Sequence, residues 1–163
     1  MAIIPITQGV DNPILRTKSE KVKKFDAKLQ KLLHDMLDTV KDENGLGIAA
    51  PQVGVNSQIF WVRFNHDTPQ EIYIPMINAE VFDISKEMEN GEEGCLSVPG
   101  VFGIVPRHNS LTVRYTDPKK KQHTLHLHGL SARIIQHEFD HLNGILCVDK
   151  MIKKTEDGAK NKK

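Results

Sequence analysis

The chain has 163 residues, 39% of them hydrophobic, which is enough for one domain with a substantial core. Its 22 Lys and Arg nearly balance its 21 Asp and Glu, so no overall field attracts nucleic acid or an anionic membrane. The first apolar run is short and is broken by Pro5, which argues against a signal peptide or a membrane span. With only two cysteines, the sequence predicts a protein of the reducing cytoplasm.

An amphipathic helix is the first predicted element. Apolar residues recur at helical spacing between Phe25 and Val40, Asp26 can cap the start of the helix, and Gly45 lies beyond its end. The apolar stripe of this helix must pack on another element.

A glycine-rich segment follows at residues 45–54. It lacks the Gly-Lys-Ser/Thr ending of a phosphate-binding loop, which argues against nucleotide binding. Gly47 is instead expected to let the backbone approach a peptide substrate, which could add as a strand along this edge.

Four strands are predicted next, at residues 58–64, 71–77, 110–115 and 122–128. The last strand carries His126 and His128 on one face, so a second metal site is conceivable there. The alternation of these histidines with Leu125 and Leu127 favours a solvated polar face instead.

A second helix carries the most informative motif of the chain, Gln136-His137-Glu138-Phe139-Asp140-His141. Helical periodicity and the Asn143-Gly144 stop predict this helix. Residues four apart share one face of a helix, so His137 and His141 can bind one metal ion while Glu138 reaches its open coordination position. The pattern is typical of a metallohydrolase; two satisfied surface histidines are the alternative.

The order of these elements predicts an α+β fold. Mostly antiparallel sheets would pack around the metal-binding helix, with one N-terminal amphipathic helix. Residues 1–150 are expected to form a single catalytic domain. Residues 151–163 are rich in lysine and lack apolar periodicity, so they are expected to be a mobile tail.

A metal site of this kind needs a third protein ligand, and cysteine is a better candidate than a carboxylate. Cys147 follows His141 at the spacing of the last histidine in one metalloprotease class. Cys95 lies far upstream, in Glu93-Gly94-Cys95-Leu96-Ser97. The residues alone leave both cysteines open.

Three separated segments together resemble the peptide deformylase family. They are Gly45-Leu46-Gly47-Ile48-Ala49-Ala50-Pro51-Gln52-Val53-Gly54, Glu93-Gly94-Cys95-Leu96-Ser97 and Gln136-His137-Glu138-Phe139-Asp140-His141-Leu142-Asn143-Gly144. The match runs from about Ile4 to Leu146, with the motifs in the family's order. Leu46 and Ile48 stand where the family more often has Ile and Leu, which is a volume-conserving exchange.

The resemblance implies a set of site residues. Three would bind one divalent metal ion: Cys95, His137 and His141. Glu138 would be the general acid/base, while the Gln52 side-chain amide and the Leu96 backbone N–H would form the oxyanion hole. The metal would be Fe²⁺ in the cell, although Zn²⁺, Ni²⁺ and Co²⁺ suit the same ligands.

The resemblance also implies an activity. The family removes the N-formyl group from the N-terminal formylmethionine of newly synthesised polypeptides and releases formate. Nascent N-formylmethionyl polypeptides would be the partners, in a bacterial-type cytoplasm, and some relatives contact the ribosome through a longer C-terminal helix that this tail does not clearly reproduce.

The methionine pocket is predicted from position. Leu46, Leu130 and Ile134 flank the motifs and are candidates to enclose an unbranched apolar side chain. Phe102 could join them, and it stands where some family members have an arginine. Glu93 and Arg107 match the family's structural ion pair, with a merely solvated pair as the alternative.

Two other classes of function stay open at this point. One is a metalloprotease that uses Cys147 as the third ligand, and the other is a catalytically silent metal-binding or chaperone-like module. Gln52 and Cys95 in their motifs favour the deformylase over the protease, and Glu138 argues against the silent module.

Overall fold

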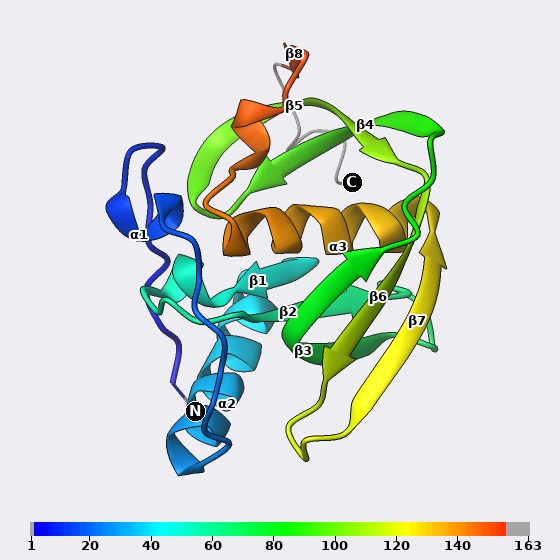
Figure 1. The fold of residues 1–163 in the computed structure, drawn as a ribbon. Coiled ribbons are helices and arrows are strands. Elements are labelled where there is room, and N and C mark those ends of the chain that lie inside the picture. Colours follow the sequence, from blue (N-terminus) through cyan, green and yellow to red (C-terminus); the bar gives the residue numbers. More distant parts are fainter. Residues whose placement is uncertain (1, 156–163) are drawn as a thin grey trace.

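Two antiparallel sheets with a helix between them form the structure (Figure 1). This computed structural model describes residues 2–155. The larger sheet has the strand order β1-β2-β3-β6-β7 and the smaller sheet the order β4-β5-β8. The named strands of the described residues pair antiparallel, as the sequence predicted. Within the same residues, no helix has the length and apolarity that crossing a membrane requires.

The strands are β1 (Gly47–Ala49), β2 (Ile59–Phe64), β3 (Ile72–Phe82), β4 (Met88–Cys95), β5 (Val98–His108), β6 (Ser110–Thr116), β7 (Gln122–His128) and β8 (Lys153–Thr155). The helices are α1 (Pro13–Arg16), α2 (Ala27–Asp42) and α3 (Gly129–Leu142), with 3-10 turns η1 (Ala50–Val53) and η2 (Cys147–Asp149).

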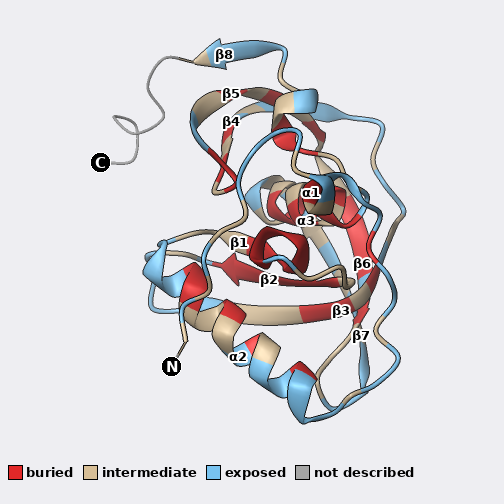
Figure 2. Cartoon of the chain, turned by 90° about the vertical axis from the view of Figure 1, so that its left-hand side faces the viewer, coloured by how far each residue is buried: buried red, intermediate tan, exposed pale blue. Residues whose placement is uncertain are grey.

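The amphipathic helix α2 covers one face of the larger sheet. The Asp26 carboxylate caps it by accepting a hydrogen bond from the Leu29 N–H at 3.1 Å. Leu29 and Leu33 are buried in a cluster with Trp61 of β2, whose indole N–H donates to the Leu33 carbonyl at 3.0 Å. Figure 2 shows α2 with buried residues on one side and exposed residues on the other.

Strand β2 is buried on both of its faces. Phe60 and Val62 belong to the core on the α3 side, whereas Ile59 and Trp61 belong to the core on the α2 side. A strand covered on both faces has no polar alternation, and the run Ile59–Phe64 has this composition.

Helix α3 lies between the two sheets because one of its sides packs on the larger sheet and the other contacts the smaller one. Ala132 and Ile135 are completely buried in the core of the larger sheet. On the other side, the Arg133 guanidinium donates to the Val105 carbonyl of β5 at 2.8 Å. The helix is therefore fixed at the centre of the molecule, where its side chains can reach both sheets.

Helix α3 ends where the sequence predicted, at Asn143 and Gly144. Asn143 is the C-cap, and Gly144 has the left-handed backbone that favours glycine, with φ of 72°. A Cβ at position 144 would also lie 2.5 Å from the Arg16 carbonyl oxygen, so this turn packs closely against α1.

The sequence predicted none of the three strands of the smaller sheet, nor the short strand β1 of the larger one. The β4–β5 hairpin is rich in Gly, Pro and Glu, so it has neither the composition nor the alternation typical of a strand. Strand β3 also continues to Phe82, beyond the predicted end at Ile77, through an irregular register between Ile77 and Glu80. Long-range pairing, not local propensity, forms these segments.

Part of the segment that follows the predicted domain boundary at residue 150 pairs with the smaller sheet. Lys153–Thr155, assigned by sequence to a mobile tail, form β8 and pair with Phe102–Ile104 of β5. Backbone hydrogen bonds with an exposed strand need no apolar side chains, which is why periodicity missed it. The rest of the predicted tail, residues 156–163, lies outside the described residues.

Candidate metal centre

Three side chains from two distant parts of the chain meet beside α3. Cys95 ends β4, while His137 and His141 lie on one face of α3, and their ligand atoms all lie within 4.8 Å of one another. The Cys95 Sγ and the His141 Nε2 are 3.4 Å apart. The pairing of β4 with β5 shifts its register between Gly94, which pairs with Phe102, and Cys95, which pairs with Val98. The sequence-predicted ligands are thus brought together.

His137 is oriented by a buried carboxylate. Its Nδ1 lies 2.9 Å from the Glu93 Oε1, which leaves Nε2 as the nitrogen free to bind a metal. Two arginines bind the same carboxylate, Arg107 at 2.8 and 2.9 Å and Arg133 at 2.6 Å. Burial disfavours the charged form of Glu93, but hydrogen bonds from Arg107 and His137 outweigh it and hold the pKa of Glu93 well below its usual value.

The Glu93–Arg107 pair is therefore buried, and the solvated alternative is wrong. The two side chains are only 6% and 2% exposed. Arg107 also binds Asp140 at 2.5 Å, and Lys150 reaches the same aspartate at 2.9 Å. This network ties the centre of the α3 motif to both strands of the hairpin.

Gln52 projects its amide at Cys95. The Gln52 Nε2 donates to the Ser97 Oγ at 3.2 Å and to the Cys95 Sγ at 3.6 Å, while its Oε1 accepts from the Ala49 N–H at 2.9 Å. Leu96, the other predicted oxyanion donor, lies in the turn between β4 and β5 next to Cys95. Both predicted donors thus lie beside Cys95, one of the predicted metal ligands.

The Glu138 carboxylate is buried beside the two motif histidines. Its exposure is 3%, and among the described residues its Oε2 has no hydrogen-bond partner. Burial raises the pKa of Glu138 above its usual value. Gly47 makes room for this side chain, because a Cβ at position 47 would lie 2.5 Å from the Glu138 Oε1.

Cys147 lies next to the site, but it does not group with both histidines. Among residues 2–155, the group of potential ligands that contains both histidines contains Cys95, whereas Cys147 groups with Glu93 and His137. The Cys147 thiol hydrogen-bonds to Cys95. This bond, with others from His137 and His141, lowers the pKa of Cys95 far below that of an ordinary thiol despite its burial. The bond and burial raise the pKa of Cys147, so Cys147 is the donor.

The predicted pocket residues lie in different environments. Leu46 and Ile134 belong to the core cluster between α3 and the larger sheet, and Ile134 is only 6% exposed. Leu130, at the start of α3, is 48% exposed. The Phe102 ring packs on Gly94, where a Cβ would overlap it.

The histidine pair on β7 agrees with the predicted polar face. His126 and His128 are exposed while Leu125 and Leu127 pack toward the core. The His126 Nδ1 lies 2.7 Å from the Thr112 Oγ1. Among the described residues, neither histidine belongs to a group of three potential ligands.

Sequence reasoning missed three residues that support the site: Ser97, Arg133 and Asp140. Ser97 is completely buried against Gln52, and Arg133 donates to the Glu93 carboxylate. Asp140 could have been noticed, because a carboxylate beside the second histidine of a buried motif needs a cation.

The donor set fits a divalent transition metal. One thiolate and two imidazole nitrogens are a ligand set that zinc, ferrous iron, cobalt or nickel accepts. Three protein ligands leave a coordination position open. The Glu138 carboxylate, whose Oε2 has no partner within residues 2–155, lies close enough to both motif histidines to interact with their charges.

Known proteins resemble this chain over nearly its whole length. The polypeptide deformylase family model matches residues 4–157. A peptide deformylase of Natranaerobius thermophilus is 42% identical over 140 residues, which are 86% of this chain and 87% of that protein. One of Desulforudis audaxviator is 41% identical over 150 residues, 92% of this chain and 94% of that protein.

Solved structures share the fold. The peptide deformylase of Thermotoga maritima superposes with a TM-score of 0.86 at 36% identity, covering 93% of this chain and 99% of that chain. The peptide deformylase of Ehrlichia chaffeensis in complex with actinonin gives a TM-score of 0.87 at 35% identity, covering 93% of this chain and 90% of that chain.

Proposed function

This chain belongs to the polypeptide deformylase family, and on that premise we propose that it removes the N-formyl group from the N-terminal formylmethionine of newly synthesised polypeptides and releases formate. One observation carries the proposal: Cys95, His137 and His141 meet beside the Gln52 amide and the Glu138 carboxylate, whose Oε2 has no partner among the described residues. The substrates are then nascent polypeptides of the cytoplasm.

Cys95, His137 and His141 would hold the metal ion, with Fe²⁺ as the ion in the cell and Zn²⁺, Ni²⁺ or Co²⁺ as other ions that suit the ligands. A divalent cation bound there would supply positive charge that makes a water molecule acidic near neutral pH and polarises a carbonyl. Glu93 would keep the Nε2 of His137 turned toward the ion, because it holds the Nδ1 of the same ring.

Glu138 would move the protons of the reaction. Its carboxylate would accept a proton from the attacking water and deliver it to the departing nitrogen, because an amine leaves poorly as an anion. The lack of a hydrogen-bond partner at its Oε2 among the described residues supports this role, since a structural carboxylate at this depth is normally paired.

Gln52 and Leu96 would stabilise the negative charge on the former formyl oxygen. The Gln52 amide is held by its acceptor and donor bonds to Ala49 and Ser97, so it is fixed before the reaction begins. Fixed donors in a buried site are effective because they need no reorganisation when the charge develops.

The peptide part of the substrate would lie along β1. This strand is at the edge of the larger sheet, so an extended chain can add to it. Leu46, the exposed Leu130 and Ile134 are the proposed neighbours of the methionine side chain. A transient contact with the ribosome is proposed from the family alone, and cosedimentation with ribosomes tests it.

Replacing Gln52 by leucine should lower kcat by a factor on the order of 10²–10³, the usual effect of removing an oxyanion donor. The substitution also leaves the Ala49 N–H unpaired. Gln52→Glu is a second variant: it keeps the acceptor for Ala49, loses the donor and adds a negative charge that opposes the developing oxyanion. Both variants should show the loss at unchanged metal content. A raised KM with unchanged kcat would assign Gln52 to substrate binding instead.

Replacing Gly47 by alanine should lower turnover by a factor on the order of 10², because the added methyl group displaces the Glu138 carboxylate. Metal content should not change. Gly45→Ala is the control, since its nearest neighbour, a Val40 methyl carbon, would lie at 3.2 Å and can shift. Equal activity of the two variants would show that Glu138 tolerates displacement.

Paired peptides test the proposed function itself. A formyl carbon carries only hydrogen, so a site closed by Gln52, Leu96 and the ion can admit formyl and exclude the methyl group of acetyl. N-formyl-Met peptides should release formate, and N-acetyl-Met peptides should release no acetate. Formyl-norleucine should remain a good substrate, since each methylene mismatch is worth only about 1–3 kcal/mol. Formyl-Asp should be a poor substrate, because its side chain is charged and the proposed pocket is apolar. Cleavage at internal peptide bonds would support a metalloprotease instead.

A further inference from the structure

A second thiol lies against the proposed metal ligand. The chain has two cysteines, and both are buried and free of disulfide bonds. Cys147 and Cys95 belong to one buried cluster with Val105, and the Cys147 thiol hydrogen-bonds to Cys95. The proposed chemistry of the site gives Cys147 no role, so this contact calls for another explanation.

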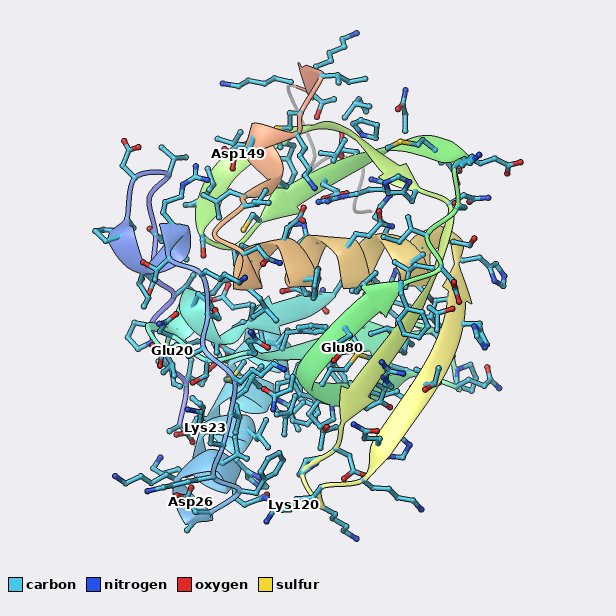
Figure 3. The ribbon with its side chains drawn as sticks, viewed as in Figure 1. Glu20, Lys23, Asp26, Glu80, Lys120 and Asp149 are labelled. Carbon is cyan, nitrogen blue, oxygen red and sulfur yellow. The ribbon has the colours of Figure 1, made fainter. Side chains whose placement is uncertain are left out.

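The segment that carries Cys147 is held in place from both sides. The Asp149 carboxylate accepts a hydrogen bond from the Leu146 N–H at 2.9 Å and pairs with Arg16 of α1 at 2.5 Å. Figure 3 shows Asp149 on the side of the molecule where α1 lies. Lys150 reaches Asp140 of α3 at 2.9 Å. Cys147 is therefore kept at Cys95 by its neighbours on either side.

Of the two cysteines, Cys95 is the more accessible to an oxidant. It is 9% exposed, whereas Cys147 is 2% exposed. The Gln52 amide donates to the Cys95 sulfur at 3.6 Å, and the thiolate is the form of cysteine that reacts.

We propose that Cys147 is a resolving thiol, which captures oxidised Cys95 as an intramolecular Cys95–Cys147 disulfide. Hydrogen peroxide is the oxidant. The Cys95 thiolate attacks one peroxide oxygen, the O–O bond breaks, hydroxide leaves, and Cys95 becomes a sulfenic acid. The Cys147 sulfur then attacks the Cys95 sulfur, the S–O bond breaks, and the proton of Cys147 leaves with the oxygen as water. Two thiols and one peroxide yield one disulfide and two waters.

The presence of Cys147 would make the oxidation of Cys95 by peroxide reversible. Without a neighbouring thiol, a sulfenic acid reacts with further peroxide to sulfinic and sulfonic acids, which thiol reductants do not restore. With Cys147 in contact, the disulfide forms first and a thiol reductant returns both cysteines. The disulfide itself rests only on the contact of the two thiols. The accompanying loss of a metal ligand rests on the proposed function.

Mass spectrometry of peroxide-treated holoenzyme tests the proposal. After treatment, the protein is denatured, alkylated and weighed, and bound metal is followed separately with a coloured chelator. The wild type should lose two hydrogens in mass, take no alkylating reagent and give a Cys95–Cys147 linked peptide. Dithiothreitol should restore both thiols.

Cys147→Ala is the matched variant, with Cys147→Ser as a second one of closer size. At the same peroxide dose, both should gain two or three oxygens on Cys95, and dithiothreitol should not reverse this change. Wild-type protein that gains oxygens on Cys95 as readily as the variants, or that forms disulfides only between molecules, overturns the proposal. Disulfide formation without release of metal would leave it intact and would contradict Cys95 as the metal ligand.

Discussion

Replacing Cys95 by alanine should remove both the metal ion and the activity, whereas Cys147→Ala should keep both. Of the two cysteines, Cys95 is the one whose sulfur lies within 4.8 Å of ligand atoms of both histidines. Cys147 groups with Glu93, which two arginines and His137 already bind. Two imidazoles alone hold a divalent ion far less tightly than two imidazoles and a thiolate. The loss should therefore be close to complete.

Metal content per chain, measured on protein purified without oxygen, decides this prediction, and formate release provides the second readout. Cys147→Ala serves as the control for removing a buried thiol, and circular dichroism checks that both variants fold. If Cys147→Ala were the metal-free protein, the ligand set of the metalloprotease alternative would be right.

Replacing Glu138 by glutamine or alanine should lower turnover by about 10²–10⁴-fold or more while the metal stays bound, as expected for a general acid/base that is not a ligand. Glutamine keeps the shape that fits over Gly47 and removes the ability to accept a proton. The fold should not suffer, because the Glu138 carboxylate is buried and, within residues 2–155, its Oε2 is unpaired. An unpaired buried charge opposes folding.

Kinetics, metal content and the Tm of the Glu138 variants provide the test. The expected result is normal metal content, a Tm no lower than that of the wild type, and a large fall in kcat. Retained activity would exclude Glu138 from the proton transfers. Loss of metal would instead show that Glu138 binds the ion directly.

The elements that the sequence predicted correctly are those with a local cause. Helix α2 begins at the Asp26 cap and buries the predicted stripe, and α3 ends at Asn143 and Gly144. Strands β2, β3, β6 and β7 lie where apolar or alternating residues predicted them. Periodicity and capping act within a few residues of one another, so a single sequence carries them.

The smaller sheet was not predicted, for a physical reason. Its strands contain residues such as Gly91, Gly94 and Gly103, which are poor strand formers by themselves. In the fold each glycine makes room for a particular neighbour: Arg133 at Gly91, Phe102 at Gly94, and Met151 at Gly103. No local pattern encodes such contacts.

The sequence by itself determined the half of the site that lies on one helix. His137, Glu138 and His141 are placed together by helical spacing alone, and the resemblance to a known family then indicated Cys95, Gln52 and Leu96. Only the tertiary structure decided which cysteine lies near both histidines, that Glu93 orients His137, and that Cys147 lies against Cys95. These contacts join β4 to α3 and η2, which both lie far from β4 along the chain. They arise from the register shift at Cys95 and the buried Glu93–Arg107 pair. Close packing between distant elements, and not sequence spacing, fixes the distance between such side chains.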